Sequence, residues 1–516
     1  MAARQVGLRN ELRARWRARP PEQRFAATIV LQVGFALLLW LLSLSLTYAA
    51  LLAFALSWLR RVPPLPWRLA LQVAIAGVFA ILGPRSLAIL LAIVFALLWA
   101  PPRHRRWLLP LAGLAAAVFY PFFGDRMFTI PVFGPFPDVG SGVYMVVFVM
   151  MAVGLNIVVG YAGLLDLGYV AFYATGAYTA AWFASLQFSN RSIHFGAVGL
   201  NPPNVAGIHI SIWLLLVLAG VFTAVAGIVI GLPTLRLRGD YLAIVTLGFG
   251  EIIYVLARNG DNFGGFNLTN GPNGITPIDS PGWGHTLSSW TGGFLPSNYL
   301  TCCKATVLGH HLSSADVFFW TALVLLVVTV FCSIRLRDSR IGRAWIAIRE
   351  DETAAAAMGI PLMRTKTWAY ASGAFFGGVA GAYYAAFKSA TFPGDFFFNI
   401  SVFILCMVIL GGMGNVWGVL IGASFLAYLN IAGLANMGAW INSHIHFIGS
   451  FQFPGETAPG LDVPAIASGI YGLIIVVVML LRPEGLLPSR RRAAELHRGV
   501  HDEPLYDATH AGGGQP

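Results

Sequence analysis

The sequence predicts an all-α polytopic membrane protein, and its composition and the length and continuity of its apolar runs support that prediction. Hydrophobic residues make up 57% of the 516 residues and charged residues only 11%, whereas ordinary soluble domains are about 25% charged. The apolar residues gather in long runs almost free of charge, and a membrane-spanning helix needs about 20 such residues. The runs are continuous and do not alternate with a period of two, so they favour helices over a β-barrel. They cover residues 25–59, 108–123, 143–188, 208–235, 317–334, 369–387, 400–435 and 463–481.

The chain begins with an Arg-rich segment, residues 1–24, that we expect in the cytoplasm. The apolar run after it has 35 residues, whereas the apolar core of a signal peptide has about 7–15. We therefore interpret this run as an uncleaved membrane segment and residues 25–106 as an N-terminal membrane extension. The number of spans in this extension stays open, because each of its apolar runs fits one long helix or a short hairpin.

The distribution of arginine predicts the topology, because basic residues mark the cytoplasmic side of a membrane protein. With both termini in the cytoplasm, 24 of the 33 Lys and Arg residues fall in inner segments and three in outer loops. This threading gives a core of roughly eight to ten helices over residues 107–482 and a cytoplasmic tail over residues 483–516. The net charge of +11 is thereby explained by membrane orientation, so we expect no nucleic-acid partner.

Two glycine-rich interruptions divide the predicted core. The charge-poor window 141–188 has 48 residues, about 70 Å as a helix, which is enough for two crossings of a membrane core ~30 Å thick. The first interruption is expected at Gly160, Gly163 and Gly168, and the second at Gly411, Gly412 and Gly414. Paired interruptions in two halves are typical of an internal repeat that builds a transport pathway. Close packing of helices through glycine is the alternative interpretation.

Polar residues near the interruptions are candidates for the pathway. Asp166 is the only charge in the first window, and a charge at mid-membrane costs at least ~2.5 kcal/mol, so it usually faces a cavity or a partner. The alternative is that Asp166 caps the helix that follows it. Glu251 lies eleven residues after Asp240, on the same helix face, and a buried carboxylate there needs a partner. Asn156 and Tyr169 are further candidates, with interhelical hydrogen bonding as the alternative role.

The sequence contains no motif of an enzyme. It has no Gly-x-x-x-x-Gly-Lys-[Ser/Thr] loop for phosphates, and none of its three lysines follows a glycine. It also lacks His-Glu-x-x-His, Gly-x-Ser-x-Gly and Cys-x-x-Cys, and its four cysteines have no metal-ligand spacing. We therefore expect no catalytic residue, no metal and no cofactor, and we place any energy source on a partner.

The longest inner loop, residues 335–366, is the candidate docking site for such a partner. Its charged residues are followed by a run of alanines, a composition that suits a short helix between two membrane spans. A charge-rich helix at the cytoplasmic face is what the docking of another subunit requires, and a merely solvated loop is the alternative. The candidate coupling residues are Arg349, Glu350, Asp351, Glu352 and Gly359.

Six stretches between residues 145 and 487, some two-thirds of the chain, carry a resemblance to a known family. They are GLLDLGYVAFYATGAY, RLRGDYLAIVTLGFGEII, NGPNGI, SRIGRAWIAIREDE, LGGMGNVWG and RPEGLL. Together they are similar to the M-type (LivM-like) permease subunits of branched-chain amino acid ABC importers. The Arg-rich front end resembles the extra N-terminal membrane region found on some of these subunits.

The resemblance implies an ABC importer permease core over residues 107–482, in the bacterial inner membrane. It also implies two ATPase subunits on the coupling loop, a second permease of the H type, and a periplasmic binding protein that delivers Leu, Ile, Val or a related amino acid. Two alternatives stay open. One is a permease of the same superfamily for urea or short amides, and the other is a proton-coupled secondary transporter in which Asp166 and Glu251 relay protons.

Overall fold

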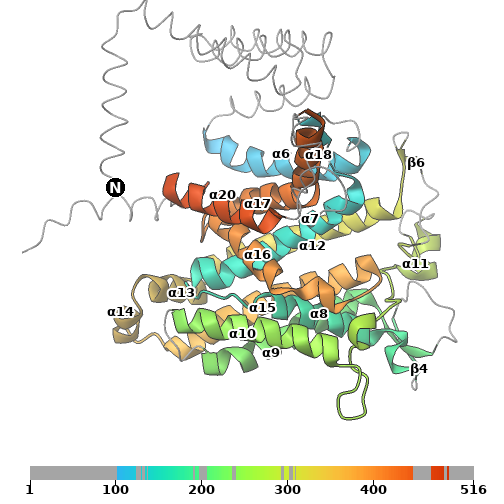
Figure 1. The fold of residues 1–516 in the computed structure, drawn as a ribbon, viewed down its shortest axis with the longest axis horizontal. Coiled ribbons are helices and arrows are strands. Elements are labelled where there is room, and N and C mark those ends of the chain that lie inside the picture. The colour runs from blue at the N-terminus through green and yellow to red at the C-terminus, as the bar shows by residue number, and fades with distance from the viewer. Residues whose placement is uncertain are drawn as a thin grey trace, which may run out of the picture.

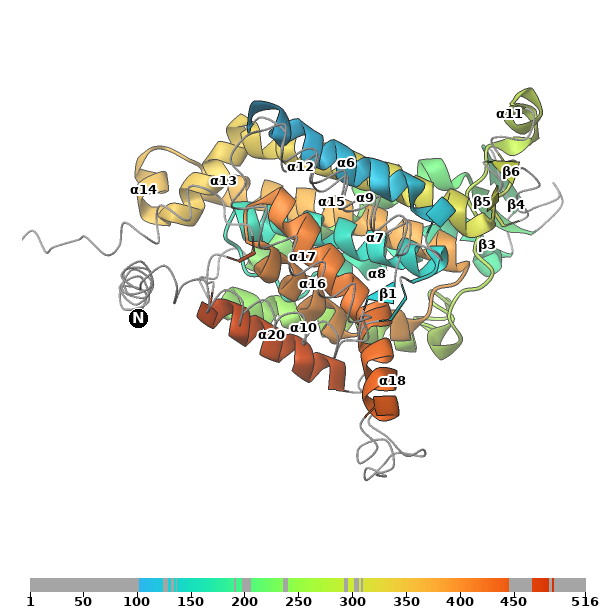
Figure 2. The ribbon, with the colours of Figure 1, turned by 90° about the horizontal axis from the view of Figure 1, so that it is seen from above.

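The computed structural model shows an elongated bundle in which most of the long helices run roughly along its long axis (Figures 1 and 2). The N-terminal segments predicted before residue 102 and most of the C-terminal tail lie outside the described residues. The structure describes residues 102–123, 129–130, 134–135, 137–189, 192–196, 206–234, 240–291, 296–300, 306–307, 310–444, 466–481 and 485–486.

A long helix, α15 (Leu362–Lys388), lies inside the bundle, and 17 of its 27 residues are buried. Three helices pack against it, namely α7 (Val139–Leu155), α8 (Val170–Phe183) and α9 (Ile212–Thr234). A π-helical segment, η2 (Asn156–Tyr161), continues α7 directly, so that α7 and η2 form one span. The four helices therefore make a core in which α15 is covered on several sides.

Glycines let α15 approach its neighbours backbone to backbone. A Cβ at Gly176 of α8 would lie 2.5 Å from the Cα of Gly378 and would overlap its carbonyl oxygen. A Cβ at Gly381 would overlap the carbonyl oxygen of Tyr173 in the same way. In a membrane the hydrophobic effect does not drive helices together, because lipid is as apolar as their side chains. Van der Waals contact from such close approach therefore stabilises their association.

A second group of helices packs around α7 and α8. Three of these helices, α12, α16 and α17, contact α7 directly, and α10 contacts α8 and α16. The other two lie further out: α20 contacts α16, and α6 contacts α12. Their bounds are α6 (Pro102–Phe123), α10 (Asp240–Asn259), α12 (Ser314–Asp338), α16 (Phe398–Gly411), α17 (Val416–Tyr428) and α20 (Ala467–Leu481). A π-helical segment, η6 (Leu429–Gly433), and α18 (Leu434–His444) continue α17.

Six of the described helices are long and apolar enough to cross a membrane. They are Val139–Tyr161, Ile212–Thr234, Tyr241–Asn259, Ser314–Asp338, Pro393–Gly411 and Val416–Ser443. Aliphatic side chains are exposed on several of them, as Val229 and Val324 show with exposed fractions of 64% and 62%. The predicted all-α polytopic membrane protein is confirmed, whereas the internal repeat and the total number of spans stay predictions.

The two ends of the bundle differ in structure (Figure 2). One end carries two short helices, α13 (Arg340–Glu350) and α14 (Glu352–Ala357). The other carries a small sheet of order β3-β5-β4, in which β3 is antiparallel and β4 parallel to β5. The remaining short elements are β1 (Thr129–Ile130), β2 (Gly134–Pro135), β3 (Ala184–Ser185), η3 (Leu186–Phe188), β4 (Ser192–Phe195), β5 (Gly207–Ile210), η4 (Gly271–Asn273), α11 (Gly284–Trp290), β6 (Thr306–Val307), β7 (His310–His311) and η5 (Pro393–Phe396).

Candidate functional site

The first glycine-rich interruption covers residues 162–169, between η2 and α8. Gly163 has a φ angle of +71°, in the left-handed region that glycine adopts without a steric penalty. A Cβ at Gly168 would overlap the carbonyl oxygen of Thr246 in α10. Glycine is therefore needed here for two reasons: the turn at Gly163 and the close approach of α10 at Gly168.

The second interruption, residues 412–415 between α16 and α17, lies against η2, the π-helical segment that leads into the first interruption and contains the candidates Asn156 and Gly160. Oδ1 of Asn156, a fully buried residue in η2, accepts a 2.9 Å hydrogen bond from the backbone N–H of Gly414. A Cβ at Gly160 would lie 2.7 Å from the nitrogen of Gly414. The structure thus brings together candidate residues that are 258 positions apart in the sequence.

Arg349 of α13 connects the candidate coupling segment to both interruptions. Its guanidinium donates a hydrogen bond to the carbonyl oxygen of Gly160. A Cβ at Gly163 would lie 2.8 Å from Cγ of Arg349, and a Cβ at Gly414 would lie 2.9 Å from Nη1. The arginine therefore occupies space that these glycines leave open, and we name Asn156, Gly160, Gly163, Arg349 and Gly414 the junction.

The rest of the predicted coupling segment is helical and folded onto the start of α15. Oδ1 of Asp351 accepts hydrogen bonds from the hydroxyl of Thr353 at 2.6 Å, from the N–H of Thr353 at 2.8 Å and from the N–H of Ala354 at 3.0 Å. These bonds, that of the Thr353 hydroxyl above all, lower the pKa of Asp351 below its usual value. Asp351 therefore caps α14 as a carboxylate.

Two further contacts hold this segment on α15. Glu352 pairs with Lys366 at 2.7 Å, and the Lys366 side chain is only 6% exposed. Nε1 of the buried Trp345 donates a 2.8 Å hydrogen bond to the carbonyl oxygen of Thr365. Beyond α14 the chain turns at Gly359, whose φ angle is +81°. The segment is thus a folded unit, with Glu350 exposed on its surface.

Asp166 lies in the first interruption and is 1% exposed. Its Oδ1 accepts a 2.9 Å hydrogen bond from the N–H of Gly168, just before α8 begins. A small cavity borders the carboxylate and is also lined by Phe249 of α10 and Tyr370 of α15. The geometry fits a carboxylate that shapes the turn into α8, and the solute-facing role stays a prediction.

Glu251 is the second carboxylate among the candidates. A buried carboxylate with a partner was expected, but within this chain the Glu251 side chain is exposed on the outer face of α10. Thr246 and Phe249 are the residues of α10 that line the cavity beside Asp166. Apolar neighbours in sequence do not show which face of a helix this chain covers, and a role for Glu251 in the pathway stays a prediction.

The other candidates take part in helix packing. The hydroxyl of Tyr169, which is fully buried, donates a 2.9 Å hydrogen bond to the carbonyl oxygen of Gly373. A Cβ at Gly411 would lie 2.5 Å from the carbonyl oxygen of Gly418, so this glycine brings α16 and α17 together. Gly412 has a φ angle of +108° and ends α16.

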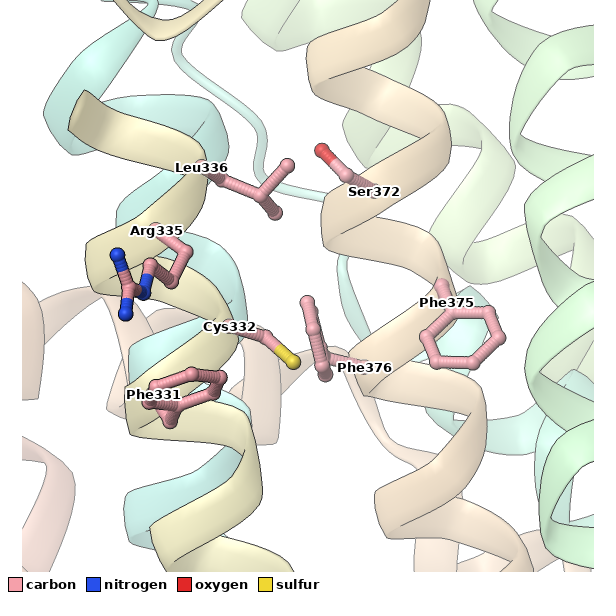
Figure 3. Close-up of a pocket in the computed structure, with 7 residues that line it drawn as sticks. All are labelled: Phe331, Cys332, Arg335, Leu336, Ser372, Phe375 and Phe376. Carbon is pink, nitrogen blue, oxygen red and sulfur yellow. The ribbon is translucent and has the colours of Figure 1, made fainter. Parts of the chain in front are cut away.

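An apolar surface pocket between α12 and α15 lies apart from these candidates (Figure 3). It has a volume of about 400 Å³, and none of the predicted site residues lines it. Two residues that were not predicted also hold the coupling segment in place, Lys366 in the first turns of α15 and Trp345 in α13. A single lysine at the edge of an apolar run, such as Lys366, could have been predicted to need an acidic partner. The contact between Trp345 and Thr365 could not be predicted, because nothing in the sequence shows which way the Trp345 side chain points.

A polytopic helical bundle that glycine interrupts twice, with a charged helical segment packed on it, is typical of a membrane transport component. The chain belongs to the family described as branched-chain amino acid transport system / permease component, whose sequence model matches residues 140–479. The matched region contains the junction and the whole candidate coupling segment.

Curated relatives of the chain include permeases from bacteria and an archaeon. The high-affinity branched-chain amino acid transport system permease proteins LivM of Salmonella typhimurium (strain LT2) and Escherichia coli (strain K12) are both 34% identical to it. The alignments cover 75% and 76% of this chain and 76% and 77% of those relatives. A probable branched-chain amino acid transport permease protein LivM of Methanocaldococcus jannaschii is 23% identical over 68% of this chain and 91% of its own length. No solved structure is significantly similar to the chain.

Proposed function

We propose that this chain is a membrane-spanning permease subunit of an ABC importer for branched-chain or related amino acids, placed in the bacterial inner membrane. The observation that supports this most is the junction, where Arg349 of the coupling segment contacts both glycine-rich interruptions. A partner that moves α13 and α14 would move this backbone directly. The substrate class comes from the names of the relatives.

In this proposal the partners divide between the two ends of the bundle. Two ATPase subunits supply the energy, and α13 and α14 provide this chain's docking surface for them. A second, H-type permease completes the membrane part, and a periplasmic binding protein delivers the solute at the end that carries β3, β4 and β5. Both termini lie in the cytoplasm, as the distribution of arginine predicts.

The amino acid is a zwitterion, and the proposal assigns it only weak contacts in the permease. Backbone N–H groups at helix ends beside the interruptions favour its carboxylate. Weak binding suits release, so we assign substrate choice mainly to the binding protein. The proton-coupled alternative is not favoured, because the family and the relatives of the chain are described as permeases of branched-chain amino acid transport systems.

The proposal is tested by purifying the tagged chain in mild detergent and identifying the co-purifying chains by mass spectrometry. We expect an ABC ATPase and a second permease, and ATP-dependent uptake of radiolabelled leucine, isoleucine or valine after reconstitution with the binding protein. Excess unlabelled urea should leave this uptake unchanged. A chain that purifies alone and transports in response to a proton gradient contradicts the proposal.

Met358→Asp is expected to reduce the co-purified ATPase at least about tenfold, since a loss of ~1.4 kcal/mol at a central contact has that effect. Met358 lies just after α14 and is 83% exposed, so it presents an apolar side chain at the tip of the coupling segment. Ile193→Asp, at a 50% exposed residue of β4 at the other end of the bundle, is the matched control and should retain the ATPase. Equal retention by both variants would place the docking surface elsewhere.

A further inference from the structure

Helix α10 is the least buried of the six long spans. In its most apolar window 28% of the residues are buried, against 33% to 78% in the others. Its most exposed residues recur after about one or two helical turns, which places them on one face of the helix. These are Tyr241 at 71%, Ile244 at 64%, Ile252 at 57% and Val255 at 51% exposed, together with the exposed Glu251, and the half-buried Gly248 lies on the same face.

Glu251 distinguishes this face from a surface that contacts lipid. It lies near the middle of α10, where a carboxylate exposed to hydrocarbon costs at least ~2.5 kcal/mol. Among the described residues of the six spans, it is the only acidic side chain away from a span end. The outward face of α9 instead carries aliphatic residues such as Val217, Val225 and Val229.

The face also has room for another helix. Gly248, one turn before Glu251, has no atom within 4 Å of the position where its Cβ would be, so the surface is notched beside the carboxylate. Close approach at small residues and hydrogen bonds between helices are the two main ways in which membrane helices associate. Phe397, which is 48% exposed and whose ring lies 4.9 Å from that of Tyr254, extends the apolar surface beyond α10.

The chemistry of Glu251 also bears on which chain covers this face. A second copy docked through the same face about a twofold axis would bring the two Glu251 carboxylates toward each other, and like charges in a low-dielectric interface are strongly unfavourable. A different chain that presents a basic or hydroxyl side chain satisfies the carboxylate. The occupant is therefore a helix with a hydrogen-bond donor and not a copy of α10.

We infer that the outward face of α10, defined by Tyr241, Ile244, Gly248, Glu251, Ile252 and Val255, is the interface with the second permease subunit, and that a donor of that subunit binds Glu251. The inference rests on the proposed function for the existence of a second permease. It adds the surface through which the two permeases associate.

Photo-crosslinking in membranes that contain the complete transporter tests this interface. Ile252 in α10 and Val225 in α9, which are 57% and 54% exposed, are each replaced by p-benzoyl-phenylalanine, and adducts are identified by mass spectrometry. We expect at least about ten times more adduct with the second permease from position 252 than from position 225, since benzophenone reacts only with what it contacts.

The outcomes separate the inference from the proposed function. If the second permease co-purifies but position 252 forms no adduct with it, or forms adducts with a second copy of this chain, the inference is overturned and the proposed function stands. If no second permease co-purifies from the same membranes, the proposed function fails first.

The pairing of Glu251 is tested by two substitutions. Glu251→Gln keeps a hydrogen-bond acceptor and should retain most of the co-purified second permease, whereas Glu251→Lys should reduce it at least about fivefold by placing a positive charge against the donor. Size-exclusion chromatography shows whether each variant remains folded. A folded Glu251→Lys variant that retains the second permease at the normal level overturns the pairing.

Discussion

Replacing Arg349 by alanine is expected to reduce amino-acid uptake about 10- to 100-fold and to leave the permease folded in the membrane. Hydrogen bonds to charged groups contribute ~1.5–3 kcal/mol, and each ~1.4 kcal/mol corresponds to a factor of ten. The variant loses the bond to the Gly160 carbonyl and empties the space beside Gly163 and Gly414. Uptake and ATP hydrolysis measured together in proteoliposomes should show hydrolysis that no longer drives transport.

Arg343→Ala is the matched control for this prediction. Arg343 lies in the same helix, α13, but it is exposed, and its Nη1 donates a 3.0 Å bond to the carbonyl oxygen of Asp338. We expect this variant to transport at nearly the normal rate. If both variants lose uptake equally, the effect comes from the charge of the segment and not from the junction. Normal uptake by Arg349→Ala would contradict the coupling role.

Gly176→Ala is expected to lower the folded yield several-fold and to reduce the unfolding temperature in detergent. The added methyl group would meet the backbone of Gly378 in α15, with the Cα at 2.5 Å, and backbone cannot move aside as a flexible side chain can. The two helices must separate, and overpacking of this kind typically costs ~1–3 kcal/mol. Thermal unfolding followed by fluorescence-detected size-exclusion chromatography measures the change.

Gly469→Ala in α20 provides the control, because a Cβ there has no atom within 4 Å. Alanine is the better helix former by ~1 kcal/mol, so this variant should be as stable as the parent or slightly more stable. A Gly176→Ala variant with an unchanged unfolding temperature would show that α8 and α15 can separate at little cost. The close contact would then not be what holds the core together.

Most residues of the candidate site could be selected from the sequence, because polar residues and glycine clusters are conspicuous within apolar runs. Asn156 and the glycines at Gly160 and Gly414 stand out in apolar sequence, and the charged run at Arg349 stands out between two spans. The sequence does not reveal that these segments meet, since Asn156 and Gly414 are 258 positions apart. Nor does it show that Arg349 points inward while Glu350, its neighbour, is exposed.

The two carboxylates show the same limit. Asp166 and Glu251 both lie in apolar sequence, and both were candidates for the pathway for that reason. In the structure Asp166 is enclosed by α8, α10 and α15, whereas Glu251 lies on the outside of α10. Apolar neighbours in sequence place a residue in the membrane, but only the packing of the helix decides whether its side chain meets protein, lipid or a partner.

The sequence by itself determined that the protein is helical and membrane-embedded, where its backbone is interrupted and where its charges collect. These properties follow from the local balance between apolar and polar side chains and from the absence of a side chain in glycine. The tertiary structure alone decided that Arg349 reaches both interruptions and that Glu251 faces outward. The physical reason is that these contacts depend on how helices far apart in the chain pack, and such packing is set by the fit of backbones and side chains along whole interfaces.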